Sequence, residues 1–175
     1  LDSLRGRMLI APTMDSIEFA WDDTKYGDYS QNPVMDMIVP TLFNPSMAPE
    51  GKHILSANIM YIPYQKKGGR SEEDKNELTE RIIDTISQYS TNIRDNILHS
   101  ELLTPLDLET EFNLTGGHWH HGELALDQML MMRPTYEAAQ YRTPIDKLYL
   151  CSAGCHPGGG IMGAAGYNAA KEIIK

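Results

Sequence analysis

The part of this chain that best predicts its fold is Leu148-Tyr149-Leu150-Cys151-Ser152-Ala153-Gly154-Cys155-His156-Pro157-Gly158-Gly159-Gly160. An apolar strand is expected over 148–151, followed by a glycine-rich loop and then a helix over Ala164–Ile174. Glycines let a ligand touch the backbone directly, and the first turn of a helix offers N–H groups that have no partner within the helix. Together these features favour the binding of an anion or an electron-rich heterocycle.

Composition limits the classes of protein to which this chain can belong. At 175 residues, with 41% hydrophobic and 22% charged residues, it is long enough for one compact domain or one domain with an appendage. A net charge of −9 argues against nucleic acid as a partner, because phosphate binding needs a basic face. No apolar run approaches the roughly 20 residues that cross a bilayer. We expect a cytoplasmic location, with peripheral attachment to a membrane left open.

The two cysteines, Cys151 and Cys155, do not have the spacing of a redox or zinc motif. They are interpreted as one buried small hydrophobe and one loop thiol in a reducing compartment.

The first half of the chain alternates short strands with helices. Strands, bounded by prolines or turn residues, are expected over 7–10, 34–39 and 54–62. Thr13 is placed to cap a helix over Met14–Lys25, which Gly27 would end. These elements predict an antiparallel sheet with helices beside it.

The clearest helical pattern begins at Ser71, which with Asp74 three residues later has the form of a capping box. Ser90-Thr91 is expected to divide this helix, and Thr104-Pro105 predicts the start of a further short helix that ends at Glu111. A stripe at three- and four-residue steps is typical of a helix face packed on a sheet. Such a stripe is formed by Leu78, Ile82, Ile86, Tyr89, Ile93 and Ile97.

Three histidines and a carboxylate lie within six residues, at His118, His120, His121 and Glu123. This density makes a His-rich metal-binding protein one alternative. In a strand, however, His118 and His120 would share one face while His121 pointed to the other, and no helical His-x-x-x-His pair is present. We therefore predict no metal ligands and expect this segment to line a ligand cavity, with hydrogen-bonded structural histidines as a further alternative.

The next segment, 123–134, is rich in methionine and ends in Arg133-Pro134. Methionine-lined surfaces often accommodate flat or flexible apolar ligands, although methionine also fills cores. Arg133 could serve a ligand anion or a neighbouring carboxylate, and the sequence leaves both open.

The segments that carry a family resemblance are 117–123, Asp127-Gln128, Arg133-Pro134, 141–145, 148–151 and 154–170. Upstream, the similar segments are Tyr26-Gly27, Pro33, Pro49-Glu50-Gly51, Pro63-Tyr64 and Thr104-Pro105-Leu106-Asp107. In order and spacing they resemble the C-terminal part of phytoene dehydrogenase-type FAD-dependent oxidoreductases, in the amine-oxidase-like flavoprotein superfamily. The resemblance covers nearly the whole chain, and 156–170 is its most specific segment.

The resemblance implies that FAD is held mainly by an N-terminal Rossmann-type unit, and that the end of this chain completes the flavin site. Residues around Ser152 would border the diphosphate and ribityl chain, and N–H groups near Ile161 would face the flavin pyrimidine ring. His121 would approach the cavity and is the one candidate for a catalytic base. The residues implied to bind the cofactor are Ser152, Ala153, Gly154, Gly159, Gly160, Ile161, Met162 and Gly163.

Three departures from the family pattern refine this expectation. Ser152 replaces a glycine that the family usually has after the strand, and Gly160 stands where amine oxidases carry an aromatic residue beside the flavin. The second departure argues against amine oxidation. The N-terminal Rossmann fingerprint is also missing, so we predict that this chain alone binds FAD weakly or not at all.

The expected fold class is α+β. Residues 1–115 would form part of a substrate-binding domain, with helices on an antiparallel or mixed sheet, and 116–147 would be a connection that lines the cavity. Residues 148–175 would supply the closing strand, Gly-loop and helix of a split Rossmann-like FAD domain.

The expected function is that of a C-terminal fragment of a desaturase or dehydrogenase that acts on CH–CH groups by flavin-mediated hydride transfer and is inactive alone. Its expected partners are an apolar small-molecule substrate and the missing FAD-binding part, with a homo-oligomer left open. The main alternative is a non-catalytic binding or oligomerising module.

Overall fold

A computed structural model describes residues 4–69 and 71–175 of the chain. The chain divides into two units, Leu1–Leu102 and Leu103–Lys175. Within the described residues, no helix has both the length and the hydrophobicity needed to cross a bilayer.

The first unit is built on a three-stranded antiparallel sheet with β2 in the middle. The register places Ile10 opposite Met35 and Met35 opposite Ile59, so apolar side chains alternate onto one face. The antiparallel sheet predicted from sequence is confirmed, and its third strand is shorter than the expected 54–62. The strands are β1 (Met8–Ile10), β2 (Met35–Ile38) and β3 (Ser56–Ile59).

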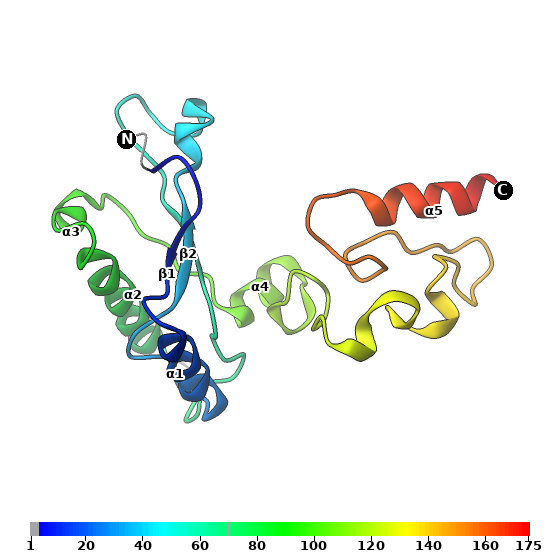
Figure 1. Cartoon of the computed structure of the whole chain (residues 1–175), viewed down its shortest axis with the longest axis horizontal. Helices are drawn as coiled ribbons and strands as arrows, with labels where there is room; N and C mark the ends of the chain where they lie inside the picture. Colours follow the sequence, from blue (N-terminus) through cyan, green and yellow to red (C-terminus); the bar gives the residue numbers. More distant parts are fainter. Residues whose placement is uncertain (1–3, 70) are drawn as a thin grey trace. The chain divides into compact units, whose positions relative to one another are not determined.

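Helix α2 (Glu72–Ser87) packs on this sheet and runs beside it in Figure 1. Leu78 and Ile82, from the apolar stripe of the helix, share one buried cluster with residues of the strands. This confirms the predicted packing of helix on sheet for Leu78, Ile82 and the partly buried Ile86, whereas Tyr89 lies beyond α2 and is 62% exposed. The capping box between Ser71 and Asp74 is present as expected. The other buried members of the cluster are Ile10, Tyr29, Met35 and Met37.

The other two helices of the first unit also follow the sequence pattern. Helix α1 (Met14–Lys25) begins at the predicted cap Thr13, and its Trp21 meets Tyr61 edge to face at 5.9 Å. Helix α2 ends before Ser90-Thr91, and α3 (Ile93–Asn96) is a separate single turn, so the predicted division is confirmed.

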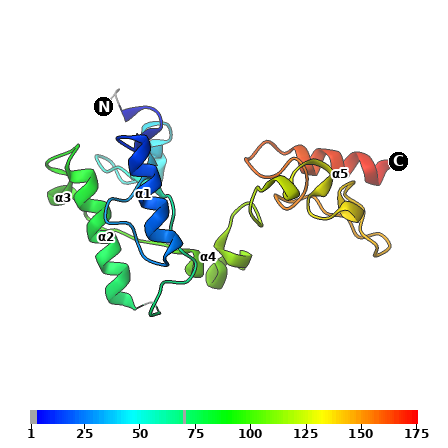
Figure 2. The same cartoon turned by 60° about the horizontal axis from the view of Figure 1, so that its bottom comes forward.

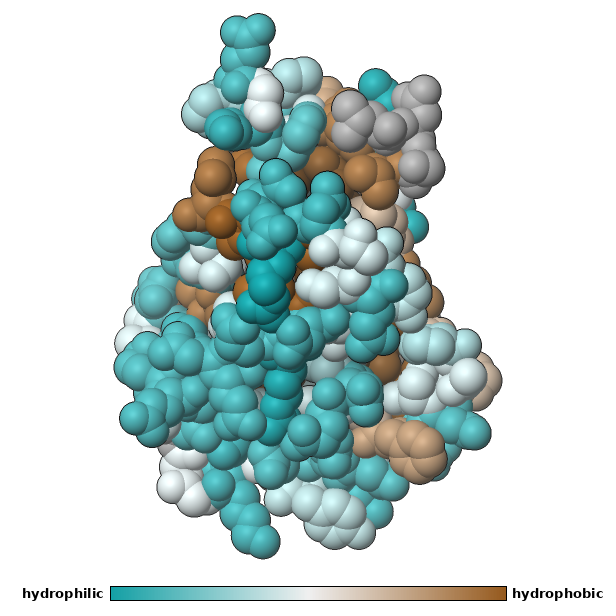
Figure 3. Space-filling view, turned by 90° about the vertical axis from the view of Figure 1, so that its left-hand side faces the viewer, coloured by the Kyte–Doolittle hydropathy of each residue, from teal (hydrophilic) through white to brown (hydrophobic). Residues whose placement is uncertain are grey.

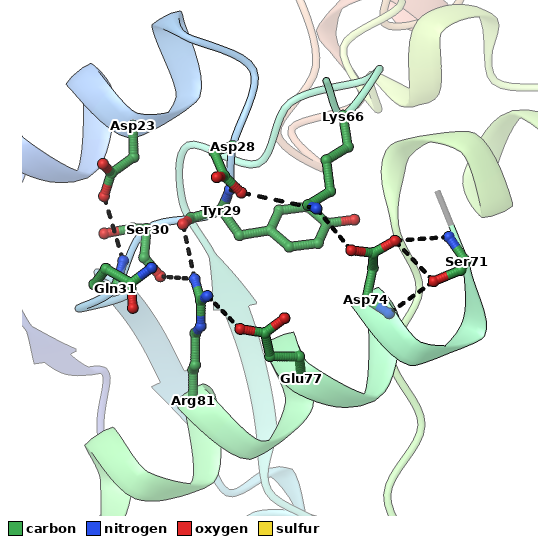
Figure 4. A network of polar contacts seen from close by, with 10 residues as sticks. All are labelled: Asp23, Asp28, Tyr29, Ser30, Gln31, Lys66, Ser71, Asp74, Glu77 and Arg81. Carbon is green, nitrogen blue, oxygen red and sulfur yellow. Dashed lines mark hydrogen bonds and ion pairs between the residues drawn. The ribbon is translucent and has the colours of Figure 1, made fainter. Parts of the chain in front are cut away.

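A polar network joins α2 to the loop that follows α1 (Figure 4). Arg81 donates to the carbonyl oxygens of Tyr29 and Ser30, at 2.9 and 3.3 Å. Lys66 Nζ lies 2.6 Å from Asp74 Oδ1, and this bond, together with those from Ser71, lowers the pKa of Asp74 to about 2. These contacts attach one loop to the middle of α2, through Arg81, and another to its first turn, through Asp74. Beyond them, the side of the unit that carries α2 and α3 is largely hydrophilic, with apolar side chains gathered mainly toward its upper end (Figure 3).

The second unit contains two α-helices, joined by a long irregular segment (Figure 2). Helix α4 (Pro105–Phe112) begins at the predicted cap Thr104 and ends one residue later than expected, and α5 (Ala164–Ile174) has the predicted bounds. Short 3-10 turns punctuate the irregular parts of both units, at Pro40–Leu42, Pro45–Met47, Thr115–Gly117, Leu126–Gln128, Leu130–Met132 and Tyr136–Ala138.

A small buried cluster holds α5 against the glycine-rich loop. Ala165 and Ala169 of the helix pack with Cys155 and Tyr141. The Tyr141 hydroxyl donates to the carbonyl of His156 at 2.9 Å and accepts a bond from the Asn168 side chain at 2.8 Å. The loop is thus attached to the helix by both packing and hydrogen bonds.

Segment 148–151 differs from the strand predicted there. In the described structure it contributes one antiparallel bridge, between Arg142 and Tyr149. Leu150 N donates to Tyr141 O at 2.8 Å, but the chain has turned back over only a few residues, so the pairing is too short for a strand. The closing strand of a Rossmann-like FAD domain stays a prediction.

Candidate functional site

The glycine-rich loop and the start of α5 border a pocket of about 470 Å³, which lies within the second unit. This volume falls in the range of roughly 300–1,000 Å³ that is typical of small-molecule sites. The described residues that line it include no Asp, Glu, Lys or Arg. They come from three segments, 119–120, 151–153 and 158–166.

Most of the cofactor residues predicted from sequence meet at this pocket. Gly154 is outside the lining, and its N–H donates to Ser152 Oγ at 3.2 Å. His121 is also outside the lining, and its Cβ lies 3.6 Å from the position that a Cβ on Gly154 would occupy. The predicted residues that line the pocket are Ser152, Ala153, Gly159, Gly160, Ile161, Met162 and Gly163.

Helix α5 begins at the pocket. Its N-cap, Gly163, has a φ of 67° and offers no side chain to cap the helix. The first N–H that bonds back into the helix is that of Tyr167, to Gly163 O at 3.0 Å. The N–H groups of the first turn therefore point toward the pocket end of the helix without intrahelical acceptors, at the positive end of the helix dipole.

Gly159 allows a close approach between the loop and His120. A Cβ on Gly159 would lie 2.6 Å from His120 Nδ1 and 3.2 Å from the Ala153 Cβ, too near for any other residue without movement. His120 Nδ1 is buried and has no hydrogen-bond partner in the described structure. Gly158 and Gly160 serve a different purpose, because their φ angles of 101° and 113° are conformations that other residues avoid.

Arg133 ties the two walls of the pocket together. It is 2% exposed, and its Nη2 donates to the carbonyl oxygens of Ala153, at 3.0 Å, and of His120. Its Nη1 lies 3.4 Å from the carbonyl oxygen of Glu123. Of the two roles that the sequence left open, a ligand anion or a carboxylate, the structure shows neither, because backbone carbonyls take its donors.

The histidine-rich segment does not assemble a metal centre in the described structure, where no three His, Cys, Asp or Glu side chains converge. His118 Nδ1 instead accepts the N–H of His120 at 3.2 Å. Burial, and after it the charges of His120 and Arg133, lower the pKa of His118.

The two cysteines have different environments. Cys155 of the glycine-rich loop is buried and Cys151 is exposed at the pocket, so the expectation of a buried cysteine before the loop and a loop thiol is wrong in its assignment, and the two roles are exchanged. Burial raises the pKa of the Cys155 thiol, so it is the less reactive of the two.

Sequence reasoning missed three contributors to the site. The histidine-rich segment was expected to line a ligand cavity, and Trp119 and His120 do line the pocket, but neither residue was singled out. The role of Arg133 depends on carbonyls 10 to 20 residues away, which no motif marks. A usable signal for His120 was the pair of glycines at 158–159, since adjacent glycines often mark a close approach by another segment.

Comparison with known proteins found relatives over most of the chain. It is 40% identical over 158 residues to "Pyridine nucleotide-disulfide oxidoreductase domain-containing protein 2" of Mus musculus, a match that covers 89% of this chain and 27% of that protein. It is 29% identical over 116 residues to one subunit of the limonene dehydrogenase of Castellaniella defragrans, with 65% and 21% covered. It is 27% identical over 135 residues to the lycopene-forming phytoene desaturase of a Paracoccus species, with 73% and 25% covered.

The chain thus spans about a quarter of the length of the curated relatives it matches. No family model matches it.

Proposed function

The chain belongs to the phytoene desaturase-like family of FAD-dependent oxidoreductases, and from this premise we propose that its second unit supplies one wall of a flavin site. The whole protein would remove hydride from a substrate C–H bond, or return it in the reverse direction. The names of the relatives that act on limonene and phytoene support an apolar small molecule as the substrate class.

The observation that carries this proposal is the pocket at the start of α5. Seven of the eight residues implied by the resemblance line it, around backbone that has little side-chain cover. No Cβ contact within 4 Å limits Gly163 or Gly166, so a flat ligand could approach the helix start closely. The absence of carboxylates among the described lining residues also fits a ligand that carries phosphate or gains negative charge.

The residues of this chain would bind and orient rather than react. First-turn N–H groups at Ala164 and Ala165 would donate to ligand oxygen or nitrogen atoms. Ile161 and Met162, both exposed beside the pocket, would shield the ligand from water. When bound, flavin supplies the hydride acceptor. His121 lies outside the pocket lining, and as a base it would act only on a substrate that reaches beyond this wall.

Titration of the chain with FAD, followed residue by residue with amide NMR shifts, tests this proposal. We expect weak, saturable shifts in 151–166. Gly166→Phe, which fills the pocket from a position with no neighbour within 4 Å, should abolish them, while Gly166→Ala should retain them. Shifts spread evenly over both units, or none in 151–166 at millimolar FAD, would contradict the proposal. Tight stoichiometric binding would contradict the expectation that the chain holds only part of the site.

A second candidate, a non-catalytic oligomerising module, is favoured by apolar side chains on the surface of the second unit. Leu126 is 88% exposed, and Leu130, Met131 and Tyr136 are each at least 60% exposed. Contiguous apolar surface often marks an interface. Light scattering distinguishes this candidate, because a clean monomer at high concentration would argue against it.

A further inference from the structure

The cation buried beside the pocket has no anionic partner in the described part of the protein. Arg133 is the largest fully buried side chain there. Its hydrogen bonds go to three backbone carbonyls, and no carboxylate among the described residues lies within ion-pair distance of it. An arginine carries its charge throughout the physiological pH range. Buried charges are normally paired, because desolvation of an unpaired charge is costly.

This charge lies directly behind the pocket wall. Two of the three carbonyls that hold it belong to His120 and Ala153, which both line the pocket. The carbonyl oxygens solvate the guanidinium with partial negative charges but do not neutralise it. The start of α5 adds the positive end of a helix dipole at the same pocket.

The chain as a whole has the opposite electrostatic character. Its net charge is −9, and none of the described residues that line the pocket is acidic. Two sources of positive potential therefore act on one small cavity in an acidic chain. Within a partly dry site such potentials are screened less than at the surface.

We propose that Arg133 is a positioning residue whose fixed positive charge, held behind the wall of the pocket, makes this pocket select ligands that carry an anionic group. The anion would occupy the pocket without touching Arg133, which is buried behind the wall and makes four hydrogen bonds to carbonyl oxygens. The inference rests on the proposed function only for the identity of the ligand: if the ligand is FAD, its diphosphate is the anionic group.

The exposed thiol of Cys151, which lines the pocket, can report this potential without any cofactor. Iodoacetate and iodoacetamide alkylate the same thiolate, by displacement of iodide, and differ in charge. The rate of alkylation of Cys151 by iodoacetate, divided by its rate with iodoacetamide, therefore measures the local electrostatic potential. This ratio does not depend on the fraction of the thiol that is ionised, because both reagents react with the same thiolate. Mass-spectrometric mapping separates Cys151 from the buried Cys155.

At low salt this ratio should be about two- to threefold higher in the folded chain than in the urea-denatured chain. This is the enrichment of an anionic reagent that one unit positive charge produces through largely aqueous surroundings, at a distance between a few ångströms and a Debye length. The excess should decrease as salt is added. Arg133→Met should reduce the excess to the smaller part that the helix dipole leaves, while Arg133→Lys, which keeps the charge, should retain most of it. Arg94→Met removes the same charge from an exposed site in the first unit and should leave the ratio unchanged.

A ratio in the folded wild-type chain at or below the denatured value would overturn the proposal, and this measurement needs no variant to fold. A folded Arg133→Met chain, by circular dichroism, with the wild-type ratio would also overturn it. Because the readout uses no flavin, it can succeed while the FAD titration fails, or the reverse. The two proposals are therefore tested separately.

Discussion

Replacement of Gly159 by alanine should destabilise the second unit through one defined collision. The added Cβ would lie 2.6 Å from His120 Nδ1, whereas ordinary contacts begin near 3.4 Å, so the ring must move by about 0.8 Å. The backbone of His120 cannot easily follow, because Arg133 holds its carbonyl oxygen. On the opposite side the Ala153 Cβ would be 3.2 Å from the new methyl group. Overpacking of this kind costs about 1–3 kcal/mol.

Urea unfolding of the full chain, followed by the fluorescence of Trp119, measures this cost. The chain has two tryptophans, and Trp21→Phe leaves only the one beside the pocket. For a unit of this size a loss of about 1–3 kcal/mol would also lower the melting temperature by roughly 4–24 °C.

Two comparisons isolate the collision from other effects. Gly166→Ala meets no atom within 4 Å and lies inside α5, so it should stabilise the unit by about 0.5–1 kcal/mol. In a His120→Ala background the cost of Gly159→Ala should fall by more than half, because the ring that it strikes is gone. If Gly159→Ala proved as stable as Gly166→Ala, the close packing of loop and histidine would be refuted.

Further predictions concern the rest of the chain. Gly117→Ala should destabilise the second unit more than Gly116→Ala does in urea unfolding. The angle φ is near +67° at both positions, but only a Cβ at position 117 would overlap the carbonyl oxygen of Pro105. Equal effects of the two substitutions would contradict the packing of this turn on α4. The pKa of Asp74 is lowered to about 2 in the folded state, below its usual value near 4. Its contribution to stability is therefore complete above about pH 4 and is lost as the pH falls through about 2. The difference in unfolding free energy between wild type and Asp74→Asn should accordingly narrow from about pH 4 to about pH 2, and a constant difference would contradict this. Thr13→Ala should cost the first unit about 0.5–2 kcal/mol by circular dichroism, and Thr13→Ser should restore most of it, because either hydroxyl can cap the N–H of Ser16.

The helices of the first unit and helix α4 of the second could be predicted because their signals are local. Thr13, Ser71 and Thr104 each have a capping partner three residues later, and all three cap helices in the structure. The stripe through Leu78 and Ile82 gave the packed face of α2 correctly, since a 3.6-residue period has few other solutions.

The strand expected at 148–151 shows where local signals fail. Four apolar or aromatic residues in a row predict an extended segment, but a strand exists only if another strand lies beside it. In the described structure the sole neighbour is the short return at 141–143, so one bridge forms. No property of the segment itself could have revealed this, because the partner is a matter of tertiary structure.

Part of the candidate site could be predicted from the sequence and part could not. Glycines and a helix start mark where a ligand can meet backbone, and most of the residues chosen on that ground do line the pocket. The loop itself, without a strand before it, has to be held by side chains from elsewhere. Arg133 binds the carbonyl of Ala153, and Tyr141 binds that of His156. These two residues precede the loop by 15 to 20 positions and fix its two halves.

The residues of the loop and the residues that hold the loop respond differently to substitution. Substitutions in the loop alter what the pocket accepts, whereas substitutions at Arg133 or Tyr141 alter whether the loop keeps its shape. Arg133 does both, because the bonds that position the loop also bury a charge beside it. A neutral residue of the same size could fill the space but would leave three carbonyls without donors, and lysine could supply the charge but not the fork that reaches His120 and Ala153 together. Arginine at this position therefore satisfies a structural and an electrostatic demand that no other side chain meets at once.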